Sequence, residues 1–395
     1  MKVDYDVIVV GAGPAGSTAA RYAAEKGASV LMLEKRQEIG SPVRCGEGIA
    51  KRWLDNIGME PSSRWIANEV DGARVISPGG YVLEVDERHA GNEAGYVVHR
   101  DIFDQELAIM AARKGVHIMV KTSATGLIKD GGKVCGVVAN NMGRIHNFKS
   151  HVVIGADGYE SQVGRWAGIP VALAESDVDT CFQRTLVNID IDYKFTHFYV
   201  GSFAPGGYMW IFPKGKDIAN VGIGFQLSKV KEPGDPMRYT DAFIARNPGL
   251  AKGQSVRDIA GAVSICAPIE RTVADGVMLV GDAARVIDPI TGGGVINGCI
   301  TGKFAGMVAA EGIQNGDLSA KFFQKYEKMW RAALEEKLFR NWMAKEKLAT
   351  MTDALFDRAI KALSEANLTK VGTLELLAAL RERDPELVRE FEDLI

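Results

Sequence analysis

The sequence predicts an α/β protein with a Rossmann-like dinucleotide-binding domain, a β-rich second domain and a helical C-terminal region. In residues 5–35, a short apolar run, a glycine-rich turn, a helical pattern and a second apolar run follow one another. Residues 182–226 are rich in β-branched and aromatic residues with turn residues between them, which is typical of an antiparallel sheet. In residues 319–351, apolar residues recur about every four positions, the period of an amphipathic helix.

The composition is that of an ordinary globular protein. The chain has 395 residues, of which 47% are apolar and 25% charged, enough for two or three domains with sizeable cores. A net charge of −3 provides no positive field for nucleic acid, so no nucleic-acid partner is expected. Five cysteines without a CxxC pair fit a reducing cytoplasm, and no metal site is predicted. With neither a signal peptide nor an apolar run of about 18 residues, we expect a cytoplasmic protein that can lie peripherally on the inner face of the membrane.

The dinucleotide motif lies at the start of the chain. Gly11, Gly13 and Gly16 complete a GxGxxG pattern between a strand at 7–10 and a helix. The first glycine permits a tight turn, the second lets a pyrophosphate approach the backbone, and the third lets helix and strand pack closely. Glu34 closes the second strand, where a carboxylate accepts hydrogen bonds from ribose hydroxyls and repels a 2′-phosphate. The cofactor is therefore NAD-like or FAD-like rather than NADP.

A second motif, at 276–310, favours FAD. It combines an apolar strand, Gly281-Asp282, a loop with three glycines and a helical pattern. FAD is long enough to need such a second anchor. Asp282 is placed to bond ribityl hydroxyls, while Gly292, Gly293 and Gly294 let a helix N-terminus approach the flavin edge that gains negative charge on reduction. The alternative is a plain strand–turn–helix with a glycine-rich loop.

A third motif, at 151–169, is a strand that ends in Ala-Asp-Gly and leads into a helix near Ser161. By itself it could be an ordinary capped βα turn. The order GxGxxG, then ADG with Ser161 and Arg165, then GDAA resembles that of flavoproteins of the aromatic-hydroxylase type. No second GxGxxG follows, so we expect the reductant to visit the flavin transiently.

The β-rich region contains a predicted hairpin around 78–80 and an unusually aromatic strand. Tyr208, Trp210 and Phe212 alternate along that strand, so their side chains share one face. They form either an ordinary sheet core or the wall of an apolar substrate cavity over the flavin, and we favour the cavity because ligand pockets form at domain junctions. The expected domains are 1–70, 95–170 and 266–330 for FAD binding, 71–94 and 171–265 for the β-rich substrate domain, and 331–395 for the helical region.

The C-terminal third is predicted to be helical. The polar side of the helix at 319–351 is rich in lysine and arginine, which suits either a solvated face or contact with anionic lipid. Asp384 and Pro385 predict the N-cap and first turn of a terminal helix, with Leu387, Phe391 and Leu394 on one side.

Several of these motifs together resemble the geranylgeranyl reductase family, and most closely its archaeal digeranylgeranylglycerophospholipid reductases. The resemblance extends from residue 6 to about 300. It is carried by GAGPAGSTAA, by RCGEG at 44–48, by GADG with GRWAG, by YMWIFPKG at 208–215 and by GDAARVIDPITGGG. RCGEG and YxWxFPKG together are specific, whereas GxGxxG and GDAA are common among flavoenzymes. Ala12, Ala15 and Cys299 are small departures from the family pattern.

The resemblance implies FAD-dependent reduction of isolated C=C bonds in geranylgeranyl chains on a phospholipid precursor. It implies an external electron donor, either ferredoxin, a deazaflavin or NAD(P)H. Arg100 begins a predicted helix, and its guanidinium suits a pyrophosphate. Beside the glycines Gly11, Gly13 and Gly293, the implied FAD contacts are Ala15, Gly16, Glu34, Cys45, Gly46, Gly48, Arg100, Ala124, Asp282, Gly294 and Val295.

The chemistry of an isolated alkene gives the SPVRCGEG segment at 41–48 a function. Because no carbonyl is conjugated to the double bond, hydride addition needs protonation of the less substituted carbon, with aromatic faces stabilising the cation. Cys45 and Glu47 are the candidate catalytic residues. A thiol is a poor acid, so Cys45 could instead gate the pocket, position a water or be structural.

Other functions remain open on the sequence alone. A geranylgeranyl diphosphate or chlorophyll-type prenyl reductase would share the motifs. An FAD monooxygenase or halogenase would use the same scaffold, and a flavin-binding lipid carrier would lack catalysis.

Overall fold

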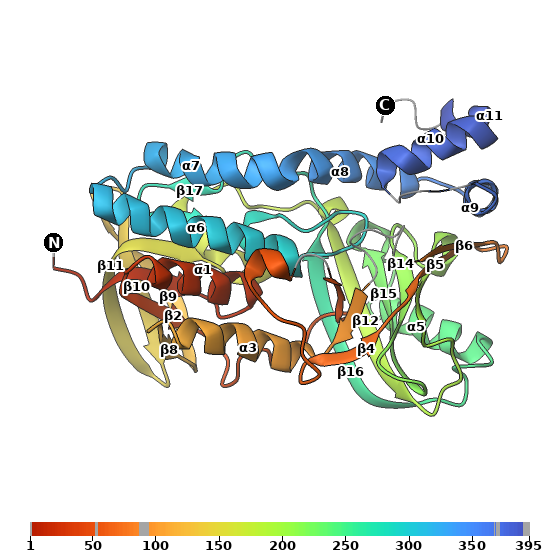
Figure 1. The fold of residues 1–395 in the computed structure, drawn as a ribbon, viewed down its shortest axis with the longest axis horizontal. Helices are drawn as coiled ribbons and strands as arrows, with labels where there is room; N and C mark the ends of the chain where they lie inside the picture. The colour runs from red at the N-terminus through yellow and green to blue at the C-terminus, as the bar shows by residue number, and fades with distance from the viewer. Residues whose placement is uncertain (1, 52–53, 87–94, 367, 369–371, 390–395) are drawn as a thin grey trace.

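The computed structural model describes residues 2–51, 54–86, 95–366, 368 and 372–389 (Figure 1). Two large sheets lie side by side, with helices α1, α3 and α6 around the first and α5 on the second. The helices that follow α6 run along one side of the molecule from the first sheet to the second.

The first sheet has eight strands and a parallel centre. Strands β8, β2, β1, β11 and β18 pair in parallel, while β17, β10 and β9 add antiparallel edges. Its central strands are runs of buried, mostly β-branched residues, as expected of a sheet covered on both faces. The bounds are Tyr5–Val10 (β1), Val30–Leu33 (β2), His117–Met119 (β8), Thr122–Asp130 (β9), Lys133–Asn141 (β10), Arg144–Gly155 (β11), Val273–Ala274 (β17) and Val277–Leu279 (β18).

Two long helices meet on this sheet at glycines. Helix α1 spans Pro14–Glu25 and helix α6 spans Val295–Asn315. A Cβ added to Gly302 would lie 2.3 Å from the carbonyl oxygen of Ala15, and one added to Gly306 would lie 2.3 Å from that of Ala19. The backbones therefore approach more closely than any side chain would allow, and α6 sets the position of the N-terminal turn of α1. Helices α3 (Arg100–Ala112) and α4 (Gln162–Ala167) complete this part of the fold.

The second sheet has seven strands in the order β16-β12-β15-β14-β13-β5-β6. Its bounds are Gln254–Ser264 (β16), Val178–Val187 (β12), Ile218–Gln226 (β15), Tyr208–Pro213 (β14), Phe195–Tyr199 (β13), Gly72–Ile76 (β5) and Val82–Asp86 (β6), with α5 at Asp235–Arg246. The predicted hairpin is confirmed by the β5–β6 pairing. One pair departs from the expected antiparallel sheet, because β13 runs parallel to β5. These two strands are far apart in sequence, so no turn forces them to be antiparallel. A small third sheet contains β3 (Gly48–Ala50), β7 (Gly95–Val98) and β4 (Ile66–Glu69).

The C-terminal region is helical, as predicted. Helix α7 (Ala320–Trp330) continues through a π-helical segment (Arg331–Glu335) into α8 (Glu336–Leu348). The predicted domain boundary at residue 331 lies inside this helical run. Helices α9 (Asp353–Ser364), α10 (Thr373–Arg383) and α11 (Pro385–Val388) follow.

The predicted terminal cap is confirmed: the Asp384 side chain accepts a hydrogen bond from the backbone N–H of Leu387 at 3.1 Å. Phe391 and Leu394 lie outside the described residues. Several basic side chains of α7 and α8 form ion pairs, such as Lys325 with Glu311 and Arg340 with Glu336. These pairs are typical of a solvated face.

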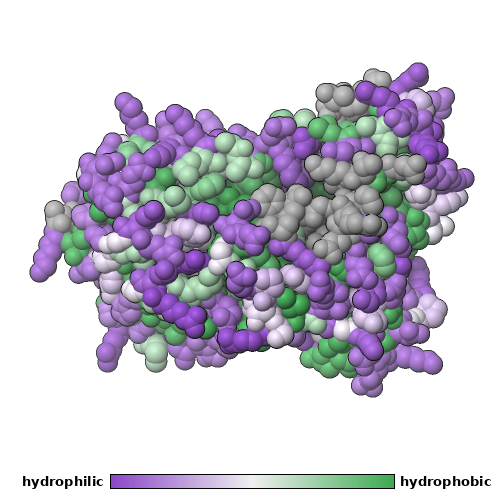
Figure 2. Space-filling view, in the orientation of Figure 1, coloured by the Kyte–Doolittle hydropathy of each residue, from purple (hydrophilic) through white to green (hydrophobic). Residues whose placement is uncertain are grey.

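The surface is mainly hydrophilic on the face shown in Figure 2, with separate hydrophobic patches between the charged side chains. Within the described ranges, no helix has both the length and the apolar character needed to span a bilayer.

Candidate active site

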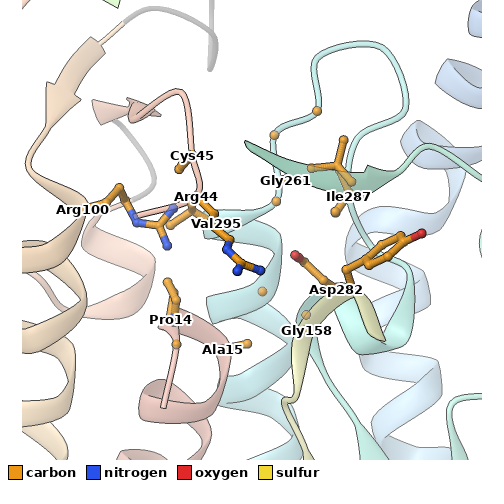
Figure 3. A pocket seen from close by; sticks show the side chains of 18 of the residues that line it. Pro14, Ala15, Arg44, Cys45, Arg100, Gly158, Gly261, Asp282, Ile287 and Val295 are labelled. Atoms are coloured by element: carbon orange, nitrogen blue, oxygen red, sulfur yellow. The ribbon is translucent and has the colours of Figure 1, made fainter. Parts of the chain in front are cut away.

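A cavity of about 830 Å³ lies between the two large sheets. Its walls come from the GxGxxG turn, the loop at 40–48, strands β12 and β14 and the glycine-rich loop before α6. It falls within the range of about 300–1,000 Å³ that is common for ligand sites. Figure 3 shows side chains from these separate segments pointing into one space.

The GxGxxG turn forms a cradle that excludes side chains. Gly11 has a φ of +103°, and a Cβ there would lie 2.2 Å from the carbonyl oxygen of Ala156. A Cβ on Gly16 would lie 1.9 Å from the carbonyl oxygen of Gly11, whereas beside Gly13 the space is open. Gly13 is also the N-cap of α1, without a side-chain cap. Free N–H groups at a helix N-terminus with open space in front suit a pyrophosphate.

Glu34 lies at the cavity wall after β2, where the turn holds its carboxylate. Oε2 accepts a hydrogen bond from the N–H of Ala12 at 3.1 Å, and Oε1 accepts one from the N–H of Arg36 at 2.9 Å. A carboxylate has about four acceptor positions, so sites for ribose hydroxyls are left.

The second anchor lies beside this cradle, since a Cβ on Gly281 would lie 2.7 Å from the Cβ of Ala15. Asp282 follows β18 in a short 3₁₀ turn, and burial raises the pKa of its carboxyl. Gly294 is the N-cap of α6, and a Cβ there would lie 3.1 Å from Oδ1 of Asp282. A carboxylate beside a helix N-terminus thus faces the cavity. Together the two anchors fit FAD in an extended form, with Gly293 and Val295 also lining the cavity at the start of α6 and Ala124 on the first sheet.

Two arginines point into the cavity above Pro14 and Ala15 (Figure 3). Arg100 begins α3, as predicted, but its guanidinium donates to both carboxylate oxygens of Asp104, at 2.8 and 3.1 Å. Asp104 was missed in the sequence, although its spacing of four from Arg100 is the signal for such a pair. Arg44 was missed as well and belongs to the RCGEG motif.

The SPVRCGEG loop contains a buried carboxylate. Glu47 is fully buried, and its backbone is held in the left-handed region at φ 75°. Oε2 accepts hydrogen bonds from Lys214 at 2.6 Å, Asn220 at 2.7 Å and Arg257 at 3.2 Å. Oε1 accepts one from the N–H of Arg100 at 3.0 Å. Each of these contacts requires an acceptor, so the geometry opposes the predicted role of Glu47 as a proton donor. We instead assign Glu47 a positioning role, because it ties the loop to the second sheet.

Steric contact with the aromatic strand explains why the residues on either side of Glu47 are glycines. A Cβ on Gly46 would lie 2.9 Å from the ring of Phe212, and one on Gly48 would lie 3.3 Å from it. The loop backbone therefore rests directly on the aromatic strand.

Cys45 lines the cavity in a half-buried position. Its sulfur accepts a hydrogen bond from the N–H of Glu47 at 3.2 Å, and its carbonyl accepts one from the side chain of Gln183 at 3.3 Å. The structure thus brings the predicted thiol into the cavity, with Cys45 held by the backbone N–H of Glu47 and by the side chain of Gln183.

The aromatic strand lines the same cavity. Tyr208, Trp210 and Phe212 all contribute to its wall, and Phe198 of β13 joins them, with ring centroids 5.4 Å from both Tyr208 and Phe212. The indole N–H of Trp210 donates to Oε1 of Gln183 at 2.8 Å, and the Tyr208 hydroxyl donates to the carbonyl of Thr291. The aromatic wall is therefore linked to the glycine-rich loop that precedes α6.

Comparison with known proteins agrees with this geometry. The chain matches the family model for FAD dependent oxidoreductases over residues 6–204 and the model for the geranylgeranyl reductase catalytic domain over residues 177–263. Fold and cradle together define the class as a flavin-dependent oxidoreductase with FAD as its cofactor.

Relatives that match along the full length of the chain identify the family within this class of flavin-dependent oxidoreductases. A digeranylgeranylglycerophospholipid reductase of Picrophilus torridus is 45% identical, with 100% of both chains covered, and one of Thermoplasma volcanium is 46% identical, with 99% of both covered. This chain belongs to the digeranylgeranylglycerophospholipid reductase family, which confirms the resemblance seen in its motifs.

Solved structures agree on the fold. A geranylgeranyl bacteriochlorophyll reductase-like protein from Thermoplasma acidophilum superimposes with a TM-score of 0.95, at 46% identity and with 99% of both chains covered. A flavin-dependent brominase superimposes with a TM-score of 0.72, at 22% identity over 97% of this chain and 100% of the other. The second likeness is one of fold alone.

Proposed function

We propose that this protein reduces the isolated C=C bonds of geranylgeranyl chains on a glycerophospholipid precursor of archaeal-type membranes. The observation that carries the proposal is the continuity of one cavity. It runs from the FAD cradle at Gly13 and Asp282 to the aromatic wall at Tyr208, Trp210 and Phe212. An apolar, aromatic cavity next to a flavin suits an apolar chain without a polar handle near the reacting bond.

The residues of the chain then have distinct tasks. Reduced FAD, when bound, supplies a hydride. The N-terminus of α1 holds the pyrophosphate, Glu34 the ribose and Asp282 the ribityl chain. The rings of Trp210 and Phe212, 7% and 9% exposed, exclude water from the alkene. Their π faces stabilise positive charge at the more substituted carbon while that carbon is short of electrons.

The electron donor and the membrane contact belong to the same proposal. The sequence has no second GxGxxG, which supports a ferredoxin, a deazaflavin or a transiently bound NAD(P)H as donor. A lipid substrate keeps its headgroup at the bilayer surface, and Phe339 and Leu374 expose 46% and 48% of their surface. These side chains support a peripheral contact on the inner face of the membrane.

The deciding experiment is an anaerobic incubation of dithionite-reduced enzyme with digeranylgeranylglyceryl phosphate in vesicles, followed by mass spectrometry of the lipid. We expect mass gains in steps of two hydrogens, with flavin reoxidised in proportion. Geranylgeranyl diphosphate in a parallel reaction tests the alternative prenyl substrate. An unchanged lipid, together with oxygenation or halogenation of an aromatic substrate on admission of air, would place the protein among monooxygenases or halogenases.

Cys45→Ala is expected to lower the rate of lipid reduction by about tenfold or more while leaving FAD bound. The thiol lines the cavity between Arg44 and Gly46, so its removal changes how the alkene and nearby water are positioned. Single-turnover flavin reoxidation and FAD titration separate the two effects. Cys135→Ala, a buried cysteine on β10 away from the cavity, is the matched control. A Cys45→Ala enzyme with the wild-type rate would contradict the role of this thiol.

A further inference from the structure

Asp179 is a buried carboxyl that the FAD cradle does not use. It is the second residue of β12, it is 7% exposed, and it lines the cavity. Its Oδ1 is buried and has no hydrogen-bond partner among the described residues. Oδ2 lies against bare backbone, because a Cβ on Gly224 or Gly207 would be 3.2 or 3.4 Å from it. Burying a polar atom without a hydrogen-bond partner destabilises the folded protein. A function of the Asp179 carboxyl would explain why it is nevertheless buried in this position.

Other carboxyls that line the cavity have partners. Asp157 also has a buried Oδ1 without a hydrogen-bond partner, but its Oδ2 accepts a hydrogen bond from the N–H of Val163 at 2.9 Å. Glu47 accepts from two cations, and Asp104 pairs with Arg100 through both oxygens. Asp288 lies 3.1 Å from Lys337 and accepts further hydrogen bonds from backbone N–H groups. Asp282 stands at the N-terminus of α6, where it belongs to the flavin anchor. Asp179 differs from all of these, since among the described residues it has no hydrogen-bond donor, no close cation and no cofactor task.

The groups around Asp179 favour its acid form. Its neighbours on β12 and β15 are the Cys181 thiol and the Gln226 amide, which donates to the carbonyl of Ser176. The cation that acts on it is Lys345 of α8, whose ammonium pairs with Glu346. Burial therefore outweighs this attraction and raises the pKa of Asp179 to about 7.

Asp179 lies on the same strand as Gln183, the residue that binds Trp210 of the aromatic wall. Asp179, Cys181 and Gln183 alternate along β12 and all line the cavity. Gln183 holds Trp210 at one end of this row, and Asp179 lies about 13 Å further along the strand. Residues 207, 222, 224 and 261, which flank the row, are glycines. A Cβ on Gly222 would lie 2.4 Å from the ring of Trp210, whereas beside Gly261 the nearest atom would be 3.8 Å away.

The end of the row at Asp179 is the end nearest to the glycine-rich loop. Gly224 pairs with Cys181 on one side and with Tyr208 on the other. Tyr208 in turn bonds to Thr291, and a Cβ on Gly292 would lie 3.6 Å from its hydroxyl. The acid, the aromatic wall and the loop at the flavin anchor therefore meet at one end of the cavity.

We propose that Asp179 is the acid that protonates the alkene, an inference that rests on the proposed function. The O–H bond of its carboxyl breaks as a C–H bond forms at the less substituted carbon. The π electrons of the alkene form that bond, and FAD, when bound and reduced, would supply the hydride for the second C–H bond at the tertiary carbon. The lipid gains two hydrogens, the flavin loses two electrons, and the Asp179 carboxylate takes a new proton from water.

The first test measures the protonation state of the Asp179 carboxyl directly and does not depend on turnover of the lipid. Infrared spectra of the FAD-bound enzyme with ¹³C-labelled aspartate should contain the C=O band of a protonated buried carboxyl at pH 6. The part of this band that is lost in Asp179→Asn is the part assigned to Asp179, and it should fade as the pH rises through about 7. A labelled wild-type enzyme without such a band at pH 6 would overturn the proposal.

The second test is the rate of lipid reduction. Asp179→Asn keeps the shape but holds no acidic proton, so we expect a loss of about 10²- to 10⁴-fold with FAD binding and dithionite reduction unchanged. The wild-type rate should fall as the pH rises above about 7, because the protonated form is the reactive one, whereas the residual rate of the variant should not depend on pH. Asp241→Asn, on α5 and paired with Arg184 away from the cavity, is the matched control.

The outcomes separate the two proposals. A wild-type enzyme that leaves the lipid unchanged refutes the proposed function, and the acid role of Asp179 falls with it. A wild-type enzyme that reduces the lipid, together with an Asp179→Asn variant of equal rate, refutes only the role of Asp179. If Asp179→Asn does not fold, Asp179→Glu restores an acidic proton and should keep both the infrared band and the pH dependence, whose absence counts against the proposal.

Discussion

Lys214→Met is expected to lower the free energy of unfolding by about 3–5 kcal/mol. The ammonium of Lys214 lies 2.6 Å from Oε2 of Glu47, and their side chains are 6% and 0% exposed. Removing the lysine leaves a carboxylate in a buried position with Arg257 and Asn220 as its remaining side-chain partners. The pair also joins the loop at 41–48 to β14, so we expect weaker FAD binding as well. Equilibrium urea unfolding and FAD titration measure the two effects.

A double-mutant cycle isolates this interaction. Glu47→Gln combined with Lys214→Met removes both charges, so the double variant should be less destabilised than the sum of the single changes. Lys35→Met serves as the control, because Lys35 pairs with Glu160 at the surface, where an ion pair contributes at most about 1 kcal/mol. If the changes in the free energy of unfolding caused by the two substitutions were strictly additive, Glu47 and Lys214 would not stabilise each other.

Gly302→Ala is expected to abolish tight FAD binding, with a loss of at least about 100-fold, and to destabilise the fold by about 1–3 kcal/mol. The new methyl group would lie 2.3 Å from the carbonyl oxygen of Ala15, which is backbone and cannot rotate away. Helix α1 must move, and the N–H groups that face the pyrophosphate move with it. Isothermal titration of the apoprotein with FAD gives the affinity.

A control for added bulk is Gly126→Ala on β9, where a Cβ would meet no heavy atom within 4 Å. It should bind FAD as the wild type does. Unchanged FAD affinity in Gly302→Ala would mean that the close contact of α1 and α6 has no part in forming the cradle.

The parts of the molecule that were predictable are those with local signals. The β1–α1–β2 unit, the turn at Asp282 and the cap at Asp384 each depend on residues within one short stretch, where spacing and residue type decide the geometry. The period-two pattern of Tyr208, Trp210 and Phe212 likewise fixed their common face. Such features could be recognised before the fold was known.

The remaining features depend on contacts between distant segments. Glu47 meets Lys214 and Arg257 only because the loop at 41–48 rests on β14, so its role as a buried anchor has no local signal. The parallel pairing of β5 with β13 has none either. The raised pKa of Asp179 arises from burial against glycines of neighbouring strands, and a lone aspartate in a strand pattern does not reveal it.

The packing of α6 against α1 also has a consequence that we expect for folding. The dinucleotide motif is complete by residue 34, yet the turn that would hold the pyrophosphate is positioned by Gly302, which contacts Ala15 although it is 302 − 15 = 287 residues further along the chain. Contacts of such long sequence separation require closure of a large loop before they stabilise anything, which slows folding. We therefore expect the N-terminal motif to complete its cofactor site on the ribosome only after α6 has been synthesised, and a chain that ends before residue 295 to bind FAD weakly.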